Sequence, residues 1–212
     1  MLQIKSFEFS PIQENTYILY NEFNDCLIID PGCYYDDEKD AIVNYIDKMD
    51  LKPQMLLNTH CHLDHVFGNK FIAEKFKLTL QIHKNEKFVL DFAPKSGLMY
   101  NLPFDNYQGE LIYLKEGDTI MLGEDELKVM EAPGHSPGHI CFYCAKQHFI
   151  ISGDVLFNRS IGRTDLPGGD HETLLKNIRE KLFALPDETK VYSGHGPTTT
   201  IGEEKKYNPF LN

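Results

Sequence analysis

The chain has 212 residues, of which 42% are hydrophobic and 25% are charged, which is the composition of a folded globular protein. Its formal net charge of −11 disfavours binding to the phosphate backbone of nucleic acids. No run of about 18 apolar residues occurs, so we expect no membrane-spanning helix. The first residues alternate like a strand and lack the apolar core of a signal peptide, and the five cysteines follow no disulfide framework. We therefore expect reduced thiols and a cytoplasmic location.

The first half of the chain is predicted to form short strands with helices between them. The predicted elements, in chain order, are strands at 4–9, 16–20 and 26–29, a helix at 37–50, a strand at 54–59, a helix at 67–77 and a strand at 79–83. Turn residues at 30–32 end the third strand. Within the first helix, Ile42, Tyr45 and Met49 recur at helical spacing, which predicts one buried face.

The second half repeats this alternation. Its predicted elements are strands at 111–114, 119–122, 126–131, 140–145 and 148–152, a helix at 171–185 and a strand at 190–193. Asp170 is the natural N-cap of the helix. Residues 91–108 include Pro94 and Gly97 among apolar residues, and we predict an irregular segment there. A contact with the substrate or another subunit is favoured over a plain surface loop. Because no repeat or linker is found, residues 1–212 are predicted to form one domain of two packed sheets with helices outside.

The densest group of potential metal ligands lies at residues 59–65, directly after a predicted strand. Residues two apart in an extended chain point to the same side, so His60 and His62 can chelate one ion. Asp64 and His65 lie further along the turn and can reach a second ion. Imidazole and carboxylate ligands suit zinc, and also iron or manganese. The alternative is a polar loop whose histidines only form hydrogen bonds.

Three further candidate ligands follow predicted strands later in the chain. His135 lies in a Pro-Gly-His-Ser-Pro-Gly segment, Asp154 follows Ser-Gly, and His195 stands between two glycines. Glycine neighbours let the backbone approach an ion closely. Each segment alone is weak, because a polar residue in a loop is usually only solvated. Together with the first group, they predict a metal site built on the ends of a rigid scaffold.

These residues resemble the motifs of the metallo-β-lactamase superfamily, and the turn at 30–32 matches as well. The resemblance spans nearly the whole chain and implies an α+β fold, a four-layer αββα sandwich with the site at one edge between the sheets. It implies that a first metal is held by His60, His62 and His135, that a second is held by Asp64, His65 and His195, and that Asp154 bridges both. Asp30 either supports the ligand loop from outside or only forms a turn.

The implied chemistry is hydrolysis with two divalent metal ions, zinc first, with iron or manganese as alternatives. Asp64 and Asp154 are the implied catalytic residues, and a thioester is the implied substrate because a thiolate leaves readily. Within the superfamily, segments 160–170 and 193–199 resemble the short bacterial form of hydroxyacylglutathione hydrolase (glyoxalase II), which lacks a C-terminal helical domain. The implied partner is a small-molecule thioester such as a glutathione conjugate, and the acyl group, the thiol carrier and the oligomeric state stay open.

Two other functions fit the same motifs. A persulfide dioxygenase-like enzyme would use one iron held by His60, His135 and Asp154, but that family typically has Ala-His-Asp where this chain has Gly-His-Gly around His195. A non-catalytic metal-binding module is disfavoured by the full ligand set. Zinc β-lactamases of the commonest type carry cysteine in place of Asp154.

Four neighbouring residues are interpreted as structural. Arg159 and Arg163 could bind a substrate carboxylate, but internal ion pairs are favoured, for example between Arg163 and Asp165. His139 is predicted to be a structural histidine rather than a ligand. Cys61 lies between two ligands on an extended stretch and should point away from the ion.

Overall fold

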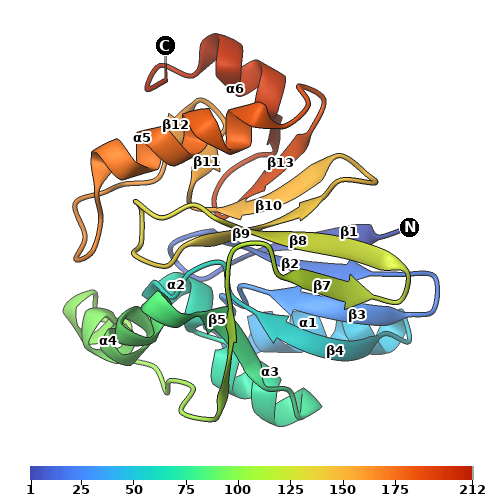
Figure 1. The fold of residues 1–212 in the computed structure, drawn as a ribbon. Helices are drawn as coiled ribbons and strands as arrows, with labels where there is room; N and C mark the ends of the chain where they lie inside the picture. Colours follow the sequence, from blue (N-terminus) through green and yellow to red (C-terminus); the bar gives the residue numbers. More distant parts are fainter. Residues whose placement is uncertain (212) are drawn as a thin grey trace.

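The computed structural model describes residues 1–211, and its strands form two large sheets packed face to face (Figure 1). In the first sheet the order is β1 (Gln3–Phe9), β2 (Glu14–Tyr20), β3 (Asp25–Ile29), β4 (Lys52–Leu57), β5 (Leu80–His83) and β6 (Leu111–Leu114). In the second sheet the order is β14 (Thr199–Thr200), β13 (Lys190–Ser193), β10 (Phe149–Gly153), β9 (Ile140–Cys144), β8 (Asp125–Glu131) and β7 (Thr119–Leu122). A small separate pair is formed by β11 (Leu156–Phe157) and β12 (Ser160–Ile161).

Helices cover the outer face of each sheet. Those against the first sheet are α1 (Asp36–Lys48), α3 (Asn69–Phe76) and α4 (Lys87–Met99), and α5 (His171–Glu180) and α6 (Ile201–Tyr207) lie against the second. The short helix α2 (Leu63–Val66) carries part of the ligand motif. The layers therefore run helix, sheet, sheet, helix, and the predicted four-layer α+β sandwich is confirmed.

Strand β2 shows why the inner strands are apolar on both sides. All seven of its residues are buried. Tyr17 and Leu19 join the cluster between the sheets, together with Phe142 and Ile151 of the second sheet. Ile18 joins the cluster beneath the helices of the first sheet. Because successive side chains of a strand point to opposite faces, one strand contributes to two hydrophobic clusters.

The prediction of an irregular segment at 91–108 is wrong for its first part, because α4 spans Lys87–Met99. Pro94 lies inside this helix and cannot donate the usual hydrogen bond to the carbonyl of Leu90. The amide of Asn106 supplies the missing donor, with its Nδ2 2.7 Å from that carbonyl oxygen. A distant side chain therefore compensates for the proline, and no local pattern reports it.

The predicted helix at 171–185 is shorter than expected. It ends at Glu180, and a 3₁₀ turn covers 182–184. Its predicted N-cap is confirmed, since the Asp170 carboxylate accepts a hydrogen bond from the backbone N–H of Thr173 at 2.7 Å. The other predicted strands and helices are present, with their ends shifted by a few residues.

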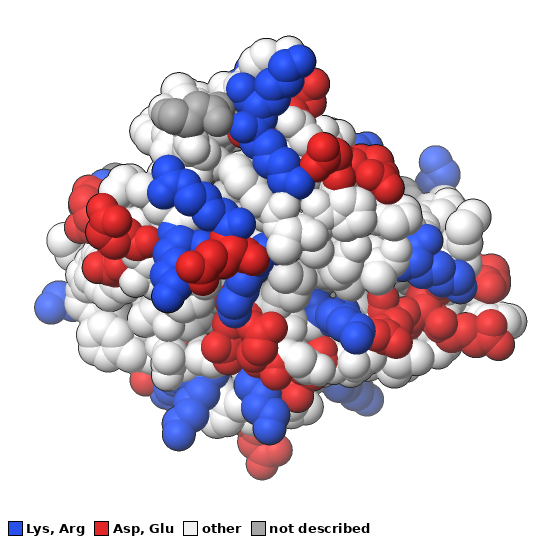
Figure 2. Space-filling view, turned by 45° about the horizontal axis from the view of Figure 1, so that its top comes forward, with Lys and Arg blue, Asp and Glu red and all other residues white. Residues whose placement is uncertain are grey.

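Charged side chains are mixed on the surface. On the face shown in Figure 2, acidic and basic groups lie next to one another in small clusters rather than forming one continuous basic patch. Among the described residues, every helix is too short or too polar to cross a membrane.

Candidate metal centre

The candidate ligands meet at one edge of the sandwich, where strands from both sheets end. The segment after β4 carries His60 and His62, and β10 and β13 are followed by Asp154 and His195. The loop between β8 and β9 carries the remaining ligand candidate of the second sheet. Gly194 is required here, because any Cβ at this position would overlap the carboxylate of Asp154. The structure therefore brings together the strand ends after which the sequence predicts metal ligands.

Three imidazole rings form the first cluster. Nδ1 of His62 lies 2.8 Å from Nε2 of His135, which lies 3.2 Å from Nε2 of His60. Nδ1 of His135 donates to the backbone carbonyl of Arg163 at 2.7 Å. This outward hydrogen bond fixes the tautomer and leaves the lone pair of Nε2 directed at the other two rings. The expected pairing of His60 and His62 on one side of the chain is present.

The second cluster combines Asp64, His65 and His195. Oδ2 of Asp64 lies 3.1 Å from Nε2 of His195 and 3.7 Å from Nε2 of His65. Nδ1 of His195 donates to the carbonyl of Gln13 at 3.0 Å, and Nδ1 of His65 donates to Oδ2 of Asp30 at 3.1 Å. Both Nε2 atoms therefore point toward the carboxylate side, which is the ring orientation of metal-ligating histidines.

Asp154 lies between the two clusters. Its Oδ1 is 3.4 Å from Nε2 of His65, and its Oδ2 is 3.5 Å from Nε2 of His135 and 3.6 Å from Nε2 of His195. One carboxylate thus reaches histidines of both clusters. The seven residues singled out in the sequence all converge on this region of the described chain.

The two clusters differ in charge. Burial lowers the pKa of His60 well below its usual value, lowers that of His62 to about 3, and also lowers that of His135. These three rings are neutral at pH 7 and can donate lone pairs without first losing a proton. Burial acts in the same direction on His65 and His195 and is the largest single effect, but the carboxylates of Asp154 and Asp64 together outweigh it, with Asp30 adding to the effect on His65, and the pKa of both rings is raised.

The carboxylates remain ionised despite their burial. Burial raises the pKa of Asp64 and Asp154 and is the largest single effect, but the interactions with His65 and His195 together outweigh it and lower both pKa values below the usual one. A cation bound at the second cluster takes the place of the protons on the histidines and keeps the carboxylates compensated. The second cluster is therefore a site for positive charge.

Two unpaired atoms test whether this donor set fits a metal. Nε2 of His65 and Oδ1 of Asp154 are buried and lie 3.4 Å apart, and neither makes a hydrogen bond of good geometry to a described residue. An unpaired buried polar atom is costly unless another group compensates it. Both atoms face the ligand clusters, so a cation bound there satisfies them. Imidazole nitrogens and carboxylate oxygens are the donors that zinc, iron and manganese accept.

Asp30 supports the ligand loop, so the alternative of a simple turn former is set aside. Its buried carboxylate accepts hydrogen bonds from the backbone N–H of Thr59 at 2.7 Å and the hydroxyl of Thr59 at 2.6 Å. It also accepts from Nδ2 of Asn58 at 3.1 Å and from the ring of His65. These contacts fix the start of the loop and orient one ligand ring.

Glu86 also holds the ligand loops and was not found from the sequence. Its buried carboxylate accepts hydrogen bonds from the backbone N–H of Cys61 at 2.8 Å and of Gly138 at 2.7 Å, and from the hydroxyl of Ser136. The Glu86 carboxylate therefore links the loop that carries His60 to the loop after β8 that carries His135. An acidic residue before an apolar helix looks like an ordinary first-turn residue, so spacing alone carried no signal.

The neighbouring residues are structural, as expected. Arg163 makes two hydrogen bonds of 2.7 Å to Asp165, and Arg159 lies 3.1 Å from Glu203. Nε2 of His139 accepts the backbone N–H of Asp154 at 3.0 Å, which orients that carboxylate-bearing residue. The predicted internal ion pair and the structural role of His139 are confirmed.

A cavity of about 450 Å³ opens beside the two clusters. It is lined by His62, Asp64, Ser96, Tyr100, His135, Asp154, Phe157, Arg163 and His195, together with Ile12, Leu63, Ile161 and Leu166. The ligand side chains therefore face a space that admits a small molecule.

The match to a known family covers residues 10–195, which fit the model of the Metallo-beta-lactamase superfamily. The chain belongs to the metallo-β-lactamase superfamily. Among its relatives in the superfamily, the "Probable metallo-hydrolase YqgX" of Bacillus subtilis is 42% identical over 95% of this chain and 94% of its own length. The "Hydroxyacylglutathione hydrolase GloC" of Haemophilus influenzae is 35% identical over 100% of this chain and 99% of its own length.

Solved structures of the superfamily share the same fold. The B3 metallo-β-lactamase BLEG-1 superposes with a TM-score of 0.91 at 38% identity, covering 99% of this chain and 100% of that chain. The protein TTHA1623 in a di-iron-bound form superposes with a TM-score of 0.88 at 34% identity, covering 98% of this chain and 100% of that chain. The superfamily fold accordingly extends over nearly all of the chain.

Proposed function

We propose that this superfamily member is a thioesterase of the hydroxyacylglutathione hydrolase type that works with two divalent metal ions. The position of Asp154 carries the proposal, because its two oxygens face histidines of both clusters. The first ion is assigned to His60, His62 and His135, the second to Asp64, His65 and His195, and Asp154 to both. Zinc is the first choice, and the di-iron form of TTHA1623 supports iron as an alternative, with manganese also accepted by these donors.

The chain's own side chains supply positioning and proton transfer. When bound, the two ions lower the pKa of water and polarise a carbonyl group. We assign to Asp64 the orientation of the attacking water and the acceptance of its proton, since this ionised carboxylate lines the cavity and lies 3.1 Å from His195. Asp154 is the second catalytic carboxylate, because it aligns the two halves of the site.

A thioester is the substrate class best supported. GloC, described as a hydroxyacylglutathione hydrolase, matches this chain over its whole length. A thiolate also leaves more readily than an alkoxide or an amine, so a hydrolase of this kind needs no dedicated acid for the leaving group. We further propose that residues 1–212 act as one catalytic domain in the cytoplasm. The five cysteines are all free and buried, which fits a reducing compartment.

A β-lactam is a second candidate substrate, favoured by the likeness to the B3 metallo-β-lactamase BLEG-1 at 38% identity. Both reactions use an attack of water on a carbonyl group, so the same residues would serve. The two functions differ in the leaving group and in the shape of the substrate. They are separated by direct comparison of a thioester with a β-lactam on one preparation.

The test is elemental analysis of protein purified without added metal, followed by assays on the same sample. We expect two metal ions per chain and hydrolysis of S-lactoylglutathione that a chelator abolishes and added zinc restores. Exposed Glu124→Gln should leave both unchanged and is the control. A single iron per chain with oxygen uptake on glutathione persulfide would instead show a persulfide dioxygenase. Hydrolysis of a β-lactam alone would show a β-lactamase.

A further inference from the structure

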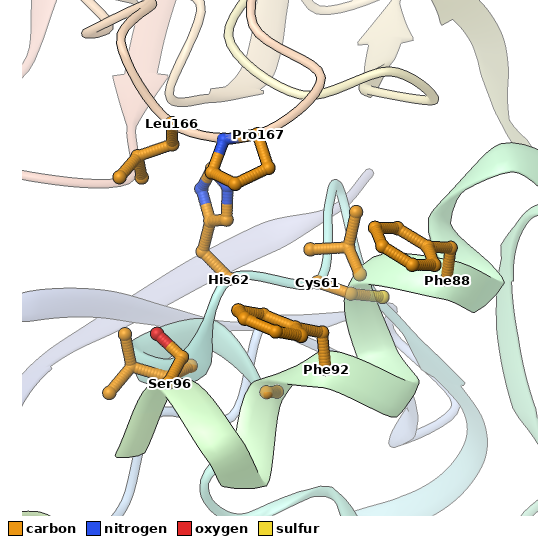
Figure 3. Close-up of a pocket in the computed structure, with 10 residues that line it drawn as sticks. Cys61, His62, Phe88, Phe92, Ser96, Leu166 and Pro167 are labelled. Atoms are coloured by element: carbon orange, nitrogen blue, oxygen red, sulfur yellow. The ribbon is translucent and has the colours of Figure 1, made fainter. Parts of the chain in front are cut away.

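A narrow apolar slot lies beside the metal clusters. It has a volume of about 50 Å³ and lies between α4 and the loop that carries Leu166 and Pro167. In Figure 3, Phe88, Phe92 and Ser96 project from α4 on one side of His62, and the loop closes the other side. The slot is therefore built from three segments that are far apart in the sequence, at 61–63, 88–96 and 166–167.

One face of α4 supplies the floor of the slot. Phe88, Phe92 and Ser96 are four residues apart, so their side chains point the same way. The opposite face of the helix, with Leu90 among its residues, packs into the core beneath the first sheet. Phe88 is 65% exposed, although large aromatic side chains are usually covered. A ligand that fills the slot buries this ring and gains hydrophobic energy.

The slot is continuous with the cavity at the metal clusters. His62, Leu63, Ser96 and Leu166 line both spaces. A molecule whose carbonyl carbon lies next to the clusters can therefore extend one substituent into the slot. The two spaces differ in character, because no Asp, Glu, Lys or Arg lines the slot, whereas Arg163 lines the larger cavity.

The slot and the larger cavity differ in size and polarity, and this difference indicates which end of a thioester each of them would hold. The larger cavity, of about 450 Å³, suits a bulky polar thiol carrier. The slot suits a small apolar group, and its volume of about 50 Å³ is below the roughly 150 Å³ of a cavity that binds benzene. An aromatic ring would therefore not fit without displacement of its walls.

We propose that this slot binds the acyl group of the substrate and selects short aliphatic acyl chains. The inference rests on the proposed thioesterase function for the position of the carbonyl group, and it adds the class of acyl group. Each methylene group that enters the slot leaves water for an apolar surface, which raises kcat/KM about fourfold. The gain stops when the slot is full, and an aromatic acyl group is a poor substrate.

The first experiment compares glutathione thioesters of acetate, propanoate, butanoate and benzoate with the metal-loaded enzyme. We expect kcat/KM to rise about fourfold per added methylene group and to be lowest for the benzoyl thioester. Phe92→Ala widens the slot, so it should flatten the rise and increase the relative rate for the benzoyl thioester. Leu98→Ala, at an exposed position of α4 that lines neither space, should keep the wild-type order.

A binding measurement tests whether the slot binds an acyl chain independently of whether the protein hydrolyses a thioester. The product acids acetate, propanoate and butanoate are titrated into the metal-loaded protein by calorimetry, and we expect affinity to rise about fourfold per methylene group. Equal affinities for the three acids, together with equal kcat/KM values for all acyl chains, would contradict the proposed role of the slot and leave the thioesterase function intact. Rising affinities without hydrolysis of any thioester would overturn the proposed function and support the slot as an aliphatic binding site.

Discussion

The backbone N–H of Cys61 donates a hydrogen bond of 2.8 Å to the buried carboxylate of Glu86. Cys61 stands between two candidate ligands, and the same carboxylate holds Ser136 and Gly138 on the loop of a third. Glu86 thus fixes the spacing of three imidazole rings from outside the site. Both oxygens of this carboxyl accept hydrogen bonds, and burial raises its pKa above the usual value.

Replacement of Glu86 by glutamine should therefore weaken the first metal site. The amide NH₂ group must face a backbone N–H or a hydroxyl group that needs an acceptor, and one buried donor is left unpaired. We expect metal affinity to fall about 10- to 100-fold with little change in the second site. Competition with a fluorescent zinc chelator measures both affinities. Glu124→Gln, at an exposed position, is the matched control, and equal affinities in the two variants would disprove the positioning role.

Asp154→Asn and Asp64→Asn should differ in which ions they release. Asp154 faces both clusters, so its neutral variant should lose affinity for both ions by at least about tenfold. Asp64 lies in the second cluster only, so its variant should keep the first ion. Elemental analysis after dialysis distinguishes the two patterns. If Asp154→Asn retains two tightly bound ions, the assignment of Asp154 to both is wrong.

Metal binding should release protons unequally at the two sites. The pKa of His65 is raised well above its usual value and that of His195 is raised as well, so a cation bound there competes with protons on these rings. The pKa values of His60, His62 and His135 are lowered, so these rings are already neutral. Binding at the second site should therefore release more protons than binding at the first, and the second site should weaken first as the pH falls from the alkaline side through neutrality. Calorimetry in buffers of different ionisation enthalpy measures the release, and equal release at both sites would contradict this.

Asn106 should stabilise α4 by bonding to the carbonyl that Pro94 leaves without a donor. Asn106→Ala removes the amide that donates to this carbonyl, and we expect a loss of about 1–3 kcal/mol in the free energy of unfolding. Pro94→Ala restores a backbone N–H at that place, so the double variant should lose less than the single one. Urea unfolding of the wild type, the two single variants and the double variant measures these differences. Simple additivity of the two substitutions would show that the proline and the amide are not coupled.

The sequence predicts that the side chains of residues 60 and 62 point to the same side of the chain, because this depends only on the local extended backbone. The N-cap at Asp170 is predictable for the same reason, since its partner Thr173 is three residues away. The approach of His195 to Asp64 depends on how two sheets pack, and only the resemblance to a known superfamily pointed to it.

Two features escaped the sequence because their partners are distant. Pro94 looks like a helix breaker until Asn106 is seen to compensate it. Glu86 looks like a solvated first-turn residue until Cys61 and Ser136 are seen to surround it. In both cases a polar group is satisfied by a residue that is 16 to 50 positions away. Periodicity and spacing report contacts within an element, and these contacts lie between elements.

The stoichiometry of bound metal tests the central claim most directly. Protein saturated with zinc, freed of excess ion by gel filtration and analysed for metal and protein, should contain two ions per chain. Asp64→Asn in parallel should contain one. A saturated wild-type protein that holds a single ion would contradict the assignment of seven side chains to a pair of neighbouring cations.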